Sequence, residues 1–341
     1  MKSNLDISIK EPLIGIRNLM KHLRPEWKPE KIQMTFYTKG KVNTLIKCSE
    51  EKDSSDAVVI RIYKPEMSQF VDREAEILAN QLIAQKNYSP TLLGIFNNGF
   101  CYDFINGQTV DIKLAKTKAV WKSIACGMAT IHGIHKPTSS PKKSNLFKVL
   151  HNLIDLLPEN LPDSVKNEQY KAYFPTKESL RKEIRELQFH LDQIKSSIVY
   201  CHGDPRLENI LWNKKITFID FEFTDYNYQA YDIAAHFNSY AGFTDDPDFS
   251  QCPDQTFQLK WLQEYIKQWN KNQNQDSKIP IDNVDMLYIQ VRKFSLATHM
   301  MLGISGILGS ALSTVDLFVY GMKRIEQYFQ HKQQVFDLKS Q

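Results

Sequence analysis

One short segment, VYCHGDPRLENILWNKKITFIDFE at residues 199–222, contains the residues whose types and spacing could do chemistry. Asp204 and Asn209 are separated by four residues, and a second apolar strand ends in Asp220 and Glu222. Phosphoryl transfer needs little covalent help, but it needs an aligned hydroxyl and cations that neutralise the phosphate oxygens. The segment therefore predicts a site that moves the γ-phosphoryl group of ATP to a hydroxyl.

Each residue of this segment has an expected role. Asp204 can orient the hydroxyl and accept its proton, while Asn209 and Asp220 supply the hard oxygen ligands that suit Mg²⁺. Glu222 projects to the same face as Asp220 on a strand of period two, so it could reach a second metal ion or a water. Taken singly, these residues are common in turns and caps. Their joint spacing favours the catalytic interpretation, with His202 as a structural member of the loop.

A second group of candidate residues lies earlier in the chain. Arg61 is a charge inside the apolar strand 57–63, where an unpaired charge is costly. We expect Arg61 to contact the phosphates and to be held by Glu76 on the following helix; a solvated edge position is the alternative. A glycine turn around Gly40, with Asn43 after it, could cover the phosphates through backbone N–H groups. An ordinary hairpin is equally compatible with that turn.

One further acid, Asp232, lies in an apolar helical stretch that follows the aromatic cluster at 226–228. A carboxylate in apolar surroundings needs hydrogen-bond partners. We interpret Asp232 as a structural group that braces the loop carrying Asp204, and we favour this role over direct participation in catalysis.

The elements that must position these residues change character along the chain. The first part of the chain combines strands with one helix and predicts a small α+β lobe. A strand–turn–strand pattern lies at 31–48, a buried strand at 57–63, helical spacing at 71–85 and a hairpin at 96–105. Beyond Asn106 and Gly107 the patterns are mainly helical. We therefore expect an N-terminal nucleotide-binding lobe over residues 1–105 and a C-terminal catalytic and substrate-binding lobe over 106–341.

The segment 294–315 lacks Asp, Glu, Lys and Arg, so it is long enough to be a membrane-span candidate. It nevertheless contains seven polar side chains and three glycines. Membrane spans are usually richer in Leu, Ile and Phe and carry anchoring aromatics at their ends. We predict a buried core helix here, with a membrane span as the alternative.

Composition excludes several other classes of protein. The 341 residues are 42% hydrophobic, and 43 basic against 39 acidic residues leave a formal net charge of only +4, without a basic block that would suit nucleic acid. The five cysteines are odd in number and form no CxxC pair, which argues against a disulfide framework or zinc site and favours a reducing cytosol. The N-terminal stretch has charges among its apolar positions and lacks the apolar core of a signal peptide.

The same motifs resemble a known family. CHGDPRLENIL at 201–211, IDFEFTDYNYQAYDIAAHF at 219–237 and FNNGFCYDFINGQTVD at 96–111 look like choline/ethanolamine kinases, and more like the ethanolamine branch. The strand VVIRIY followed by VDREAEIL, the KSNL at 143–146 and the stretch 252–266 support this resemblance, which covers most of residues 36–328.

The resemblance implies a bilobal protein-kinase-like α+β fold, with a small, mainly antiparallel-sheet N-lobe, a larger helical C-lobe and ATP between them. It implies that Asp204 is the base, that Asn209 and Asp220 bind Mg²⁺, and that Arg61 with Glu76 acts on the phosphates. It also implies that the hinge contacting adenine consists of Asp103, Phe104 and Ile105. The product would be phosphoethanolamine or phosphocholine for phospholipid synthesis.

The chain departs from the family pattern at five positions. The family usually has Asn at Gly203, Ser or Thr at Val42, an acidic residue near Ser239, and tryptophans at Leu302 and Ser305. The acid and the aromatics are the groups expected to hold an ammonium head by charge and cation–π attraction. Their loss leaves the phosphoryl-transfer residues intact, and a less caged pocket fits ethanolamine better than choline.

Three hypotheses follow for the function. The first is an ATP- and Mg²⁺-dependent kinase of ethanolamine, with choline or a related small hydroxyl substrate as the runner-up. The second is a nucleotide-binding regulatory protein that has lost its substrate pocket, and the third is a membrane protein spanning at 294–315. For the first we expect a cytoplasmic enzyme without a nucleic-acid partner or membrane span, and a homodimer is left open.

Overall fold

The computed structural model describes residues 1–37, 43–50, 55–64, 71–137, 142–273, 278–280, 283–312 and 316–339. The chain divides into two compact units. Unit 1 consists of Met1–Thr109 and Asn209–Thr224, and unit 2 of Val110–Glu208 and Asp225–Gln341. Unit 1 is therefore discontinuous in sequence, because a late segment of the chain returns to it. The expected lobe division at residues 105 and 106 stays a prediction.

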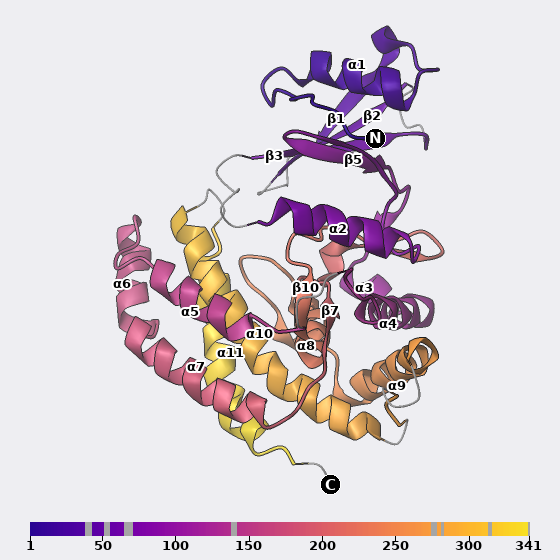
Figure 1. Cartoon of the computed structure of the whole chain (residues 1–341). Helices are drawn as coiled ribbons and strands as arrows, with labels where there is room; N and C mark the ends of the chain where they lie inside the picture. The colour runs from indigo at the N-terminus through magenta and orange to yellow at the C-terminus, as the bar shows by residue number, and fades with distance from the viewer. Residues whose placement is uncertain are drawn as a thin grey trace. The chain divides into compact units, whose positions relative to one another are not determined.

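Unit 1 is built on an antiparallel sheet in the order β1-β2-β3-β5-β4 (Figure 1). Its elements are α1 (Pro12–Leu23), β1 (Gln33–Tyr37), β2 (Asn43–Ser49), β3 (Val58–Tyr63), α2 (Arg73–Ala84), β4 (Leu92–Phe96), β5 (Gly99–Asp103), β6 (Gln108–Thr109), β8 (Ile210–Trp212) and β9 (Ile216–Phe218). The last three form a small antiparallel sheet in the order β6-β8-β9. The strands expected around 31–48 and at 57–63, and the helix expected over 71–85, are confirmed.

The core of unit 1 lies between α1 and one face of the larger sheet. Ile16 and Leu19 of α1 are buried in one cluster with Ile46 of β2 and with Ile60 and Ile62 of β3. Because alternate residues of a strand face opposite sides, this packing leaves Arg61 on the other face of β3. The sheet thus directs one charged side chain away from its apolar core.

The hairpin expected over 96–105 lies earlier than predicted. Its first strand, β4, ends at Phe96, and the connection to β5 consists of Asn97 and Asn98 rather than an Asn-Gly pair. The short apolar stretch before Phe96 contains Gly94, where the strand pairing is irregular. Because β4 has no polar residue to alternate with the apolar ones, the sequence pattern did not reveal the strand.

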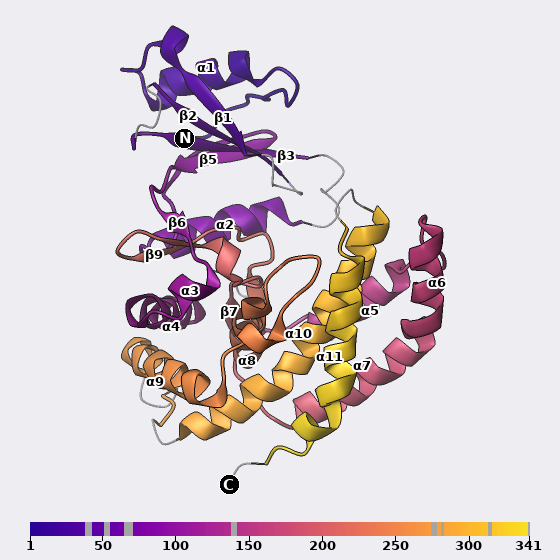
Figure 2. The same cartoon turned by 180° about the vertical axis from the view of Figure 1, so that it is seen from behind.

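Unit 2 is mainly helical. It comprises α3 (Ile112–Ala115), α4 (Lys118–His132), α5 (Leu146–Leu156), α6 (Ser164–Tyr173), α7 (Lys177–Asp192), β7 (Ile198–Cys201), β10 (Asp225–Tyr228), α8 (Gln229–Asn238), α9 (Gln255–Asn272), α10 (Val284–Leu312) and α11 (Phe318–Phe336). The long helix α10 contacts α5, α7, α8, α9 and α11, and it runs beside α11 (Figure 2). A Cβ atom on Gly306 would lie 2.8 Å from the Cα of Gly321, so glycines allow these two helices to cross closely.

The helix α10 also contains most of the segment that was considered as a membrane-span candidate. Among the described residues, Val284–Ala311 is the one helix long and apolar enough to cross a membrane by length and composition, and 61% of its apolar window is buried within the protein. Burial at this level is expected for a core helix that contacts five others. Its assignment as a core helix rather than a membrane span stays a prediction.

Candidate functional site

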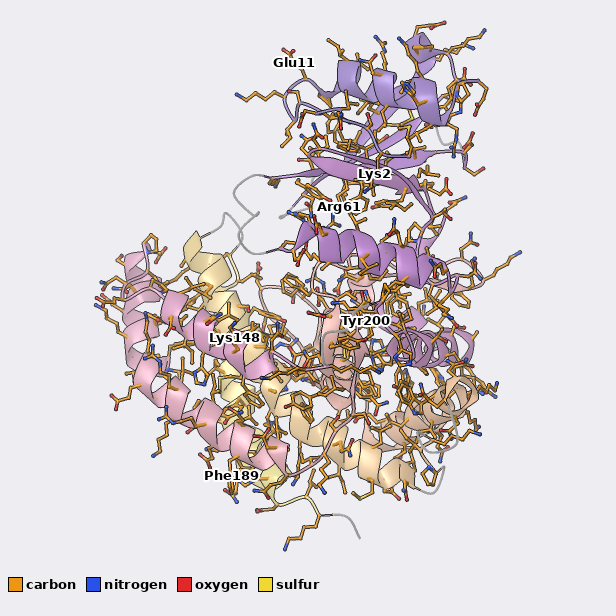
Figure 3. All side chains as sticks on the ribbon, viewed as in Figure 1. Lys2, Glu11, Arg61, Lys148, Phe189 and Tyr200 are labelled. Atoms are coloured by element: carbon orange, nitrogen blue, oxygen red, sulfur yellow. The ribbon has the colours of Figure 1, made fainter. Side chains whose placement is uncertain are left out.

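The first group of candidate residues is a charged cluster in unit 1 centred on Arg61. Its Nη2 lies 2.7 Å from Oε1 of Glu76, 2.9 Å from Oδ1 of Asp220 and 3.0 Å from Oε2 of Glu222. Arg61 comes from β3 and faces α2, which carries Glu76 (Figure 3). The structure therefore brings Arg61 and Glu76 together with Asp220 and Glu222, which lie much later in the sequence, and the sequence singled out all four.

The position of Glu76 on α2 follows from the start of that helix. Asp72 is the N-cap, and its Oδ1 accepts a hydrogen bond from the backbone N–H of Ala75 at 3.0 Å. Glu76 then lies in the first turn, where a negative charge is favoured by the helix dipole. It is buried at 1% exposure, so its partners must come from other side chains of the unit.

A second arginine, Arg73, completes the pairing of Glu76 and was not singled out from the sequence. Its Nη1 lies 3.1 Å from Oε2 of Glu76, and its guanidinium lies 4.2 Å from the ring centre of Tyr63. Glu76 thus uses one carboxylate oxygen for each arginine. The spacing of three residues between Arg73 and Glu76 on a helix was the available signal.

The cluster holds more negative than positive charge, and the pKa values reflect this. Burial and then repulsion from Asp220 raise the pKa of Glu222 to about 8. Burial also raises the pKa of Glu76, against the opposing charge of Arg61. For Arg61, burial lowers the pKa but the carboxylates of Asp220, Glu76 and Glu222 raise it by more, so the guanidinium stays charged. A further cation would relieve the repulsion among the carboxylates.

Asp220 has an unusual backbone conformation. Its φ angle is +69°, in the left-handed region that few residues other than glycine adopt. Because an extended strand cannot include this conformation, β9 ends at Phe218, and Asp220 and Glu222 lie beyond the strand. The expectation that a strand of period two places these two acids on one face was therefore wrong, although both reach Arg61. Strain of this kind is often found at functional sites.

Asn209 is tied directly to this backbone. Its carbonyl oxygen accepts a hydrogen bond from the N–H of Ile219 at 3.0 Å, and the residue is buried at 5% exposure. Asn209 and Asp220, the two residues expected to bind metal, are therefore carried by hydrogen-bonded neighbouring segments of unit 1.

The donor atoms of the cluster fit a divalent cation. One carboxylate oxygen each from Glu76, Asp220 and Glu222 lie within 4.8 Å of one another. Carboxylate oxygens are the hard ligands that Mg²⁺ prefers, and Mg²⁺ usually binds through one or two of them together with waters and phosphate oxygens. Glu76 is held by both arginines, which leaves Asp220 and Glu222 as the carboxylates best suited to a metal ion.

A second group of candidate residues lies in the loop that follows β7 in unit 2. The carboxylate of Asp232 accepts hydrogen bonds from the backbone N–H groups of His202 and Gly203, both at 2.9 Å. Nδ1 of His236 donates to the carbonyl oxygen of Pro205 at 2.9 Å. Two side chains of α8 therefore hold this loop at three successive points. The predicted bracing role of Asp232 is confirmed.

Gly203 explains one departure from the family pattern. Its φ angle is +87°, a conformation that glycine adopts freely and that asparagine tolerates better than most residues. The Asn expected here from the family resemblance would meet the same backbone requirement as Gly203.

Behind the loop, Asp232 is part of a fully buried network that the sequence did not reveal. Nε2 of His132 donates to Asp232 at 3.0 Å, and Nδ1 of His132 contacts the hydroxyl of Tyr265 at 2.6 Å. Gln229 donates to the same hydroxyl at 2.9 Å. Burial acts to raise the pKa of Asp232, but the hydrogen bond and charge of His132 outweigh it and lower the pKa. Asp232 is therefore a stable anion that anchors the loop.

Asp204 itself lies at the accessible side of this loop. Its Oδ2 is 3.2 Å from Nε of Arg206, and the two side chains are 26% and 27% exposed. The guanidinium of Arg206 lies 4.4 Å from the ring centre of Phe243. Arg206 was missed from the sequence, where its position two residues after Asp204 was the available signal.

The remaining predicted residues have mixed outcomes. Asn43 begins β2 and donates to Glu222 at 3.5 Å, whereas Gly40 lies outside the described residues. Asp103 ends β5 and pairs with Arg24 at 3.1 Å. The N–H of Phe104 donates to the carbonyl of Ala57, and the carbonyl of Ile105 accepts from the N–H of Gly107. The nucleotide-binding roles of Gly40, Asn43 and the segment 103–105 stay predictions.

The residues expected to depart from the family pattern lie directly after α8 and on α10. Ser239 is buried, and its hydroxyl donates to the carbonyl oxygen of His236 at 2.7 Å. Leu302 and Ser305 are half-buried on α10. None of the three carries a charge or an aromatic ring, so they offer neither of the usual attractions for an ammonium group.

Comparison with known proteins places these observations in context. The family profile described as choline/ethanolamine kinase matches residues 34–329. The chain is 34% identical over 330 residues to ethanolamine kinase 1 from Homo sapiens, covering 95% of this chain and 73% of that protein. Among solved structures, it is similar to an ethanolamine kinase from Plasmodium vivax, with a TM-score of 0.78 and 23% identity over 98% of this chain and 93% of that one.

A second solved structure, a choline kinase from Cryptosporidium parvum, is similar with a TM-score of 0.76 and 21% identity, covering 94% of this chain and 96% of that one. More distant similarity extends to an aminoglycoside 2'-phosphotransferase, with a TM-score of 0.56. At these identities the structural similarities concern the fold, and they confirm the predicted kinase-like α+β fold.

Proposed function

Because the chain belongs to the choline/ethanolamine kinase family, we propose that it transfers the γ-phosphoryl group of ATP to the hydroxyl of ethanolamine, forming phosphoethanolamine for phospholipid synthesis. The observation that carries the chemistry is the buried cluster of Arg61, Glu76, Asp220 and Glu222. The acceptor follows from the curated relatives. They are ethanolamine kinases, and they match this chain over nearly all of its length.

In this proposal, unit 1 binds the metal and the nucleotide. Asn209 and Asp220 hold Mg²⁺, with Glu222 as an accessory ligand, and the ion would neutralise negative charge on the phosphate oxygens. Arg61 would donate to the phosphates, while Asp220 and Glu222 would serve the metal ion. The ion pair to Glu76 holds the guanidinium of Arg61 in place.

Further groups of unit 1 contact the nucleotide in this proposal. Gly40 and Asn43 contribute to covering the phosphates, and Asp103, Phe104 and Ile105 contact the adenine.

Unit 2 supplies the base in this proposal. Asp204 orients the hydroxyl of the acceptor and takes its proton as the new O–P bond forms and the bond from the γ-phosphorus to the bridging oxygen breaks, which releases ADP. The loop that carries it is fixed by Asp232 and His236, so the carboxylate does not have to be ordered at each turnover.

The decisive experiment measures phosphoryl transfer from ATP to a panel of amino alcohols, aminoglycosides and sugars, for the native protein and for Asp204→Ala. We expect ethanolamine to be the best acceptor and the variant to lose turnover while it still binds ATP. Turnover that survives the substitution would contradict the role of Asp204. Binding of ATP without turnover on any acceptor would favour a regulatory nucleotide-binding protein.

Choline is the second candidate acceptor, because the family is described as choline/ethanolamine kinase and one of the similar solved structures is a choline kinase. The proposal includes a cytoplasmic location without a membrane span, which fractionation with a salt wash would test. A homodimer is left open.

A further inference from the structure

Arg206 occupies an unusual place beside the proposed base. Its Nε lies 3.2 Å from Oδ2 of Asp204, and its guanidinium lies 4.4 Å from the ring centre of Phe243. A carboxylate and an aromatic face are the two groups that attract an organic ammonium ion in proteins. Both groups are thus already engaged by a cation that belongs to the protein.

The surroundings of Phe243 within unit 2 add a second positive charge. Phe243 packs edge-on against Tyr320 with ring centres 5.1 Å apart, and the fully buried guanidinium of Arg324 lies 4.9 Å from the ring centre of Tyr320. Arg324 donates to the carbonyl oxygen of Asn238 at the end of α8. The two connected aromatic rings therefore each have an arginine on them.

We propose that Arg206 is a specificity-determining residue of the acceptor pocket, which it closes to quaternary ammonium alcohols such as choline by covering the carboxylate and the ring face. This inference rests on the proposed function. A primary ammonium has three N–H donors, so it can use oxygen acceptors in place of a ring. A quaternary ammonium has none, and it depends on the aromatic faces that Arg206 covers.

The pair of Arg206 and Asp204 is accessible enough to respond to a ligand. The two side chains are 27% and 26% exposed, and ion pairs at this level of exposure contribute little to stability. Replacing Arg206 should therefore leave the fold intact. The main consequence should be the loss of the guanidinium from the face of Phe243 and from the carboxylate of Asp204.

The test compares Arg206→Gln, which keeps a polar side chain but removes the charge, with Arg206→Lys, which keeps the charge but loses the planar group. Two quantities are measured: kcat/KM for ethanolamine, its N-methyl and N,N-dimethyl derivatives and choline, and binding of choline without ATP by calorimetry. In Arg206→Gln the ratio of kcat/KM for choline over ethanolamine should rise about tenfold, with tighter choline binding. Arg206→Lys should show a smaller rise.

The matched control is Arg181→Gln, because Arg181 is also an accessible arginine of unit 2 paired with an aspartate, Asp155. It should change neither quantity. An unchanged choline ratio and unchanged choline binding in Arg206→Gln would overturn the inference about Arg206.

The binding measurement separates this inference from the proposed function. If no amino alcohol is phosphorylated but choline binds more tightly to Arg206→Gln, the role of Arg206 is supported and the acceptor assignment fails. If ethanolamine is phosphorylated by both proteins with the same choline ratio, the proposed function is supported and the inference about Arg206 fails.

Discussion

The Arg61 cluster of unit 1 and the Asp232 network of unit 2 are both buried and charged, but they balance their charges differently. In unit 1, three carboxylates share the nearby guanidinium groups of Arg61 and Arg73, and burial raises the pKa of Glu222 to about 8. In unit 2, one carboxylate accepts hydrogen bonds from two backbone N–H groups and from His132, and its pKa is lowered.

Because of this difference, the carboxylates of the Arg61 cluster are able to exchange partners, whereas the carboxylate of Asp232 is fixed by its partners. A surplus of carboxylates favours the entry of a cation, so the unit 1 cluster is suited to bind and release a metal ion with the nucleotide. Asp232 has its partners within the protein, and removing any of them would leave a buried group unsatisfied. We therefore expect substitutions in unit 1 to affect activity first, and substitutions in the Asp232 network to affect stability as well.

The largest expected effect comes from Asp220→Asn. The variant keeps the shape of the side chain and tolerates the left-handed backbone but loses a charged ligand, so kcat should fall by about 10³-fold. Its unfolding free energy, measured with urea, should stay within about 1 kcal/mol of the native protein. Asp56→Asn in the same unit, whose carboxylate is 57% exposed and pairs with Arg24, is the control and should change neither value. A fully active Asp220→Asn enzyme would contradict the metal role.

Asp232→Asn should disrupt the hydrogen-bond network of unit 2 that is centred on Asp232. The amide has one acceptor oxygen, so the N–H of either His202 or Gly203 faces an NH₂ group in a buried place. Losing one partner of such a network costs about 3–5 kcal/mol, which urea unfolding would measure together with a fall in kcat. Asp225→Asn, at a carboxylate that is 52% exposed, is the matched control and should cost less than about 1 kcal/mol. Equal stability of the two variants would argue against the anchoring role.

The pH dependence of stability sharpens the same contrast. Burial lowers the pKa of His236 to about 4 in the folded protein, so below about pH 6.5 the unfolded chain binds a proton that the folded protein does not. Stability from this histidine is therefore complete above about pH 6.5 and is lost as the pH falls towards 4, by at most roughly 3 kcal/mol. Urea unfolding at pH 7.5 and 5.5 would measure the loss.

His236→Asn is the test variant for this pH effect, since its amide can still donate to Pro205 but does not titrate. It should reduce the difference in stability between the two pH values, although not abolish it, because burial also lowers the pKa of His299. An undiminished pH dependence in this variant would exclude His236 as a source.

The smallest expected effect is stabilisation by the metal ion. If the carboxylates of unit 1 bind Mg²⁺, the folded native protein should gain about 1.4 kcal/mol at ten times the dissociation constant, seen as a rise of a few degrees in Tm. Asp220→Asn should lose this rise, while Asp232→Asn should keep it from a lower starting Tm. A rise in Tm that is the same in native protein and Asp220→Asn would place the ion elsewhere.

The sequence predicted the elements and the charged partners well, because their signals are local or follow a strong period. The strand carrying Arg61 and the helix carrying Glu76 have clear apolar patterns, and the helix α10 has no Asp, Glu, Lys or Arg over its second half. The helix α6 (Ser164–Tyr173) was missed, since none of its residues is buried and it has no apolar face to reveal it.

The details of the site depended on information that a linear pattern does not contain. The positive φ angle of Asp220 ends β9 early, and no residue type in that stretch requires such a conformation. The contacts of Arg73, Arg206 and His132 depend on which elements pack together, and this is set by the tertiary structure. The members of the Arg61 cluster and the bracing role of Asp232 could be predicted from residue types and spacing, whereas the contacts of Arg73, Arg206 and His132 could not.

The discontinuity of unit 1 has a consequence for how the protein is made. During translation, residues 1–109 emerge first, but the segment that supplies β8, β9 and the two acids at 220 and 222 follows only after residues 110–208 have been added. Until then Arg61 has Glu76 as its carboxylate partner from the cluster, and β6 lacks the strand with which it pairs. Unit 1 therefore cannot be completed on the ribosome as the first domain of the chain, and the pairing of Arg61 with the acids at 220 and 222 forms only after most of the enzyme has been synthesised.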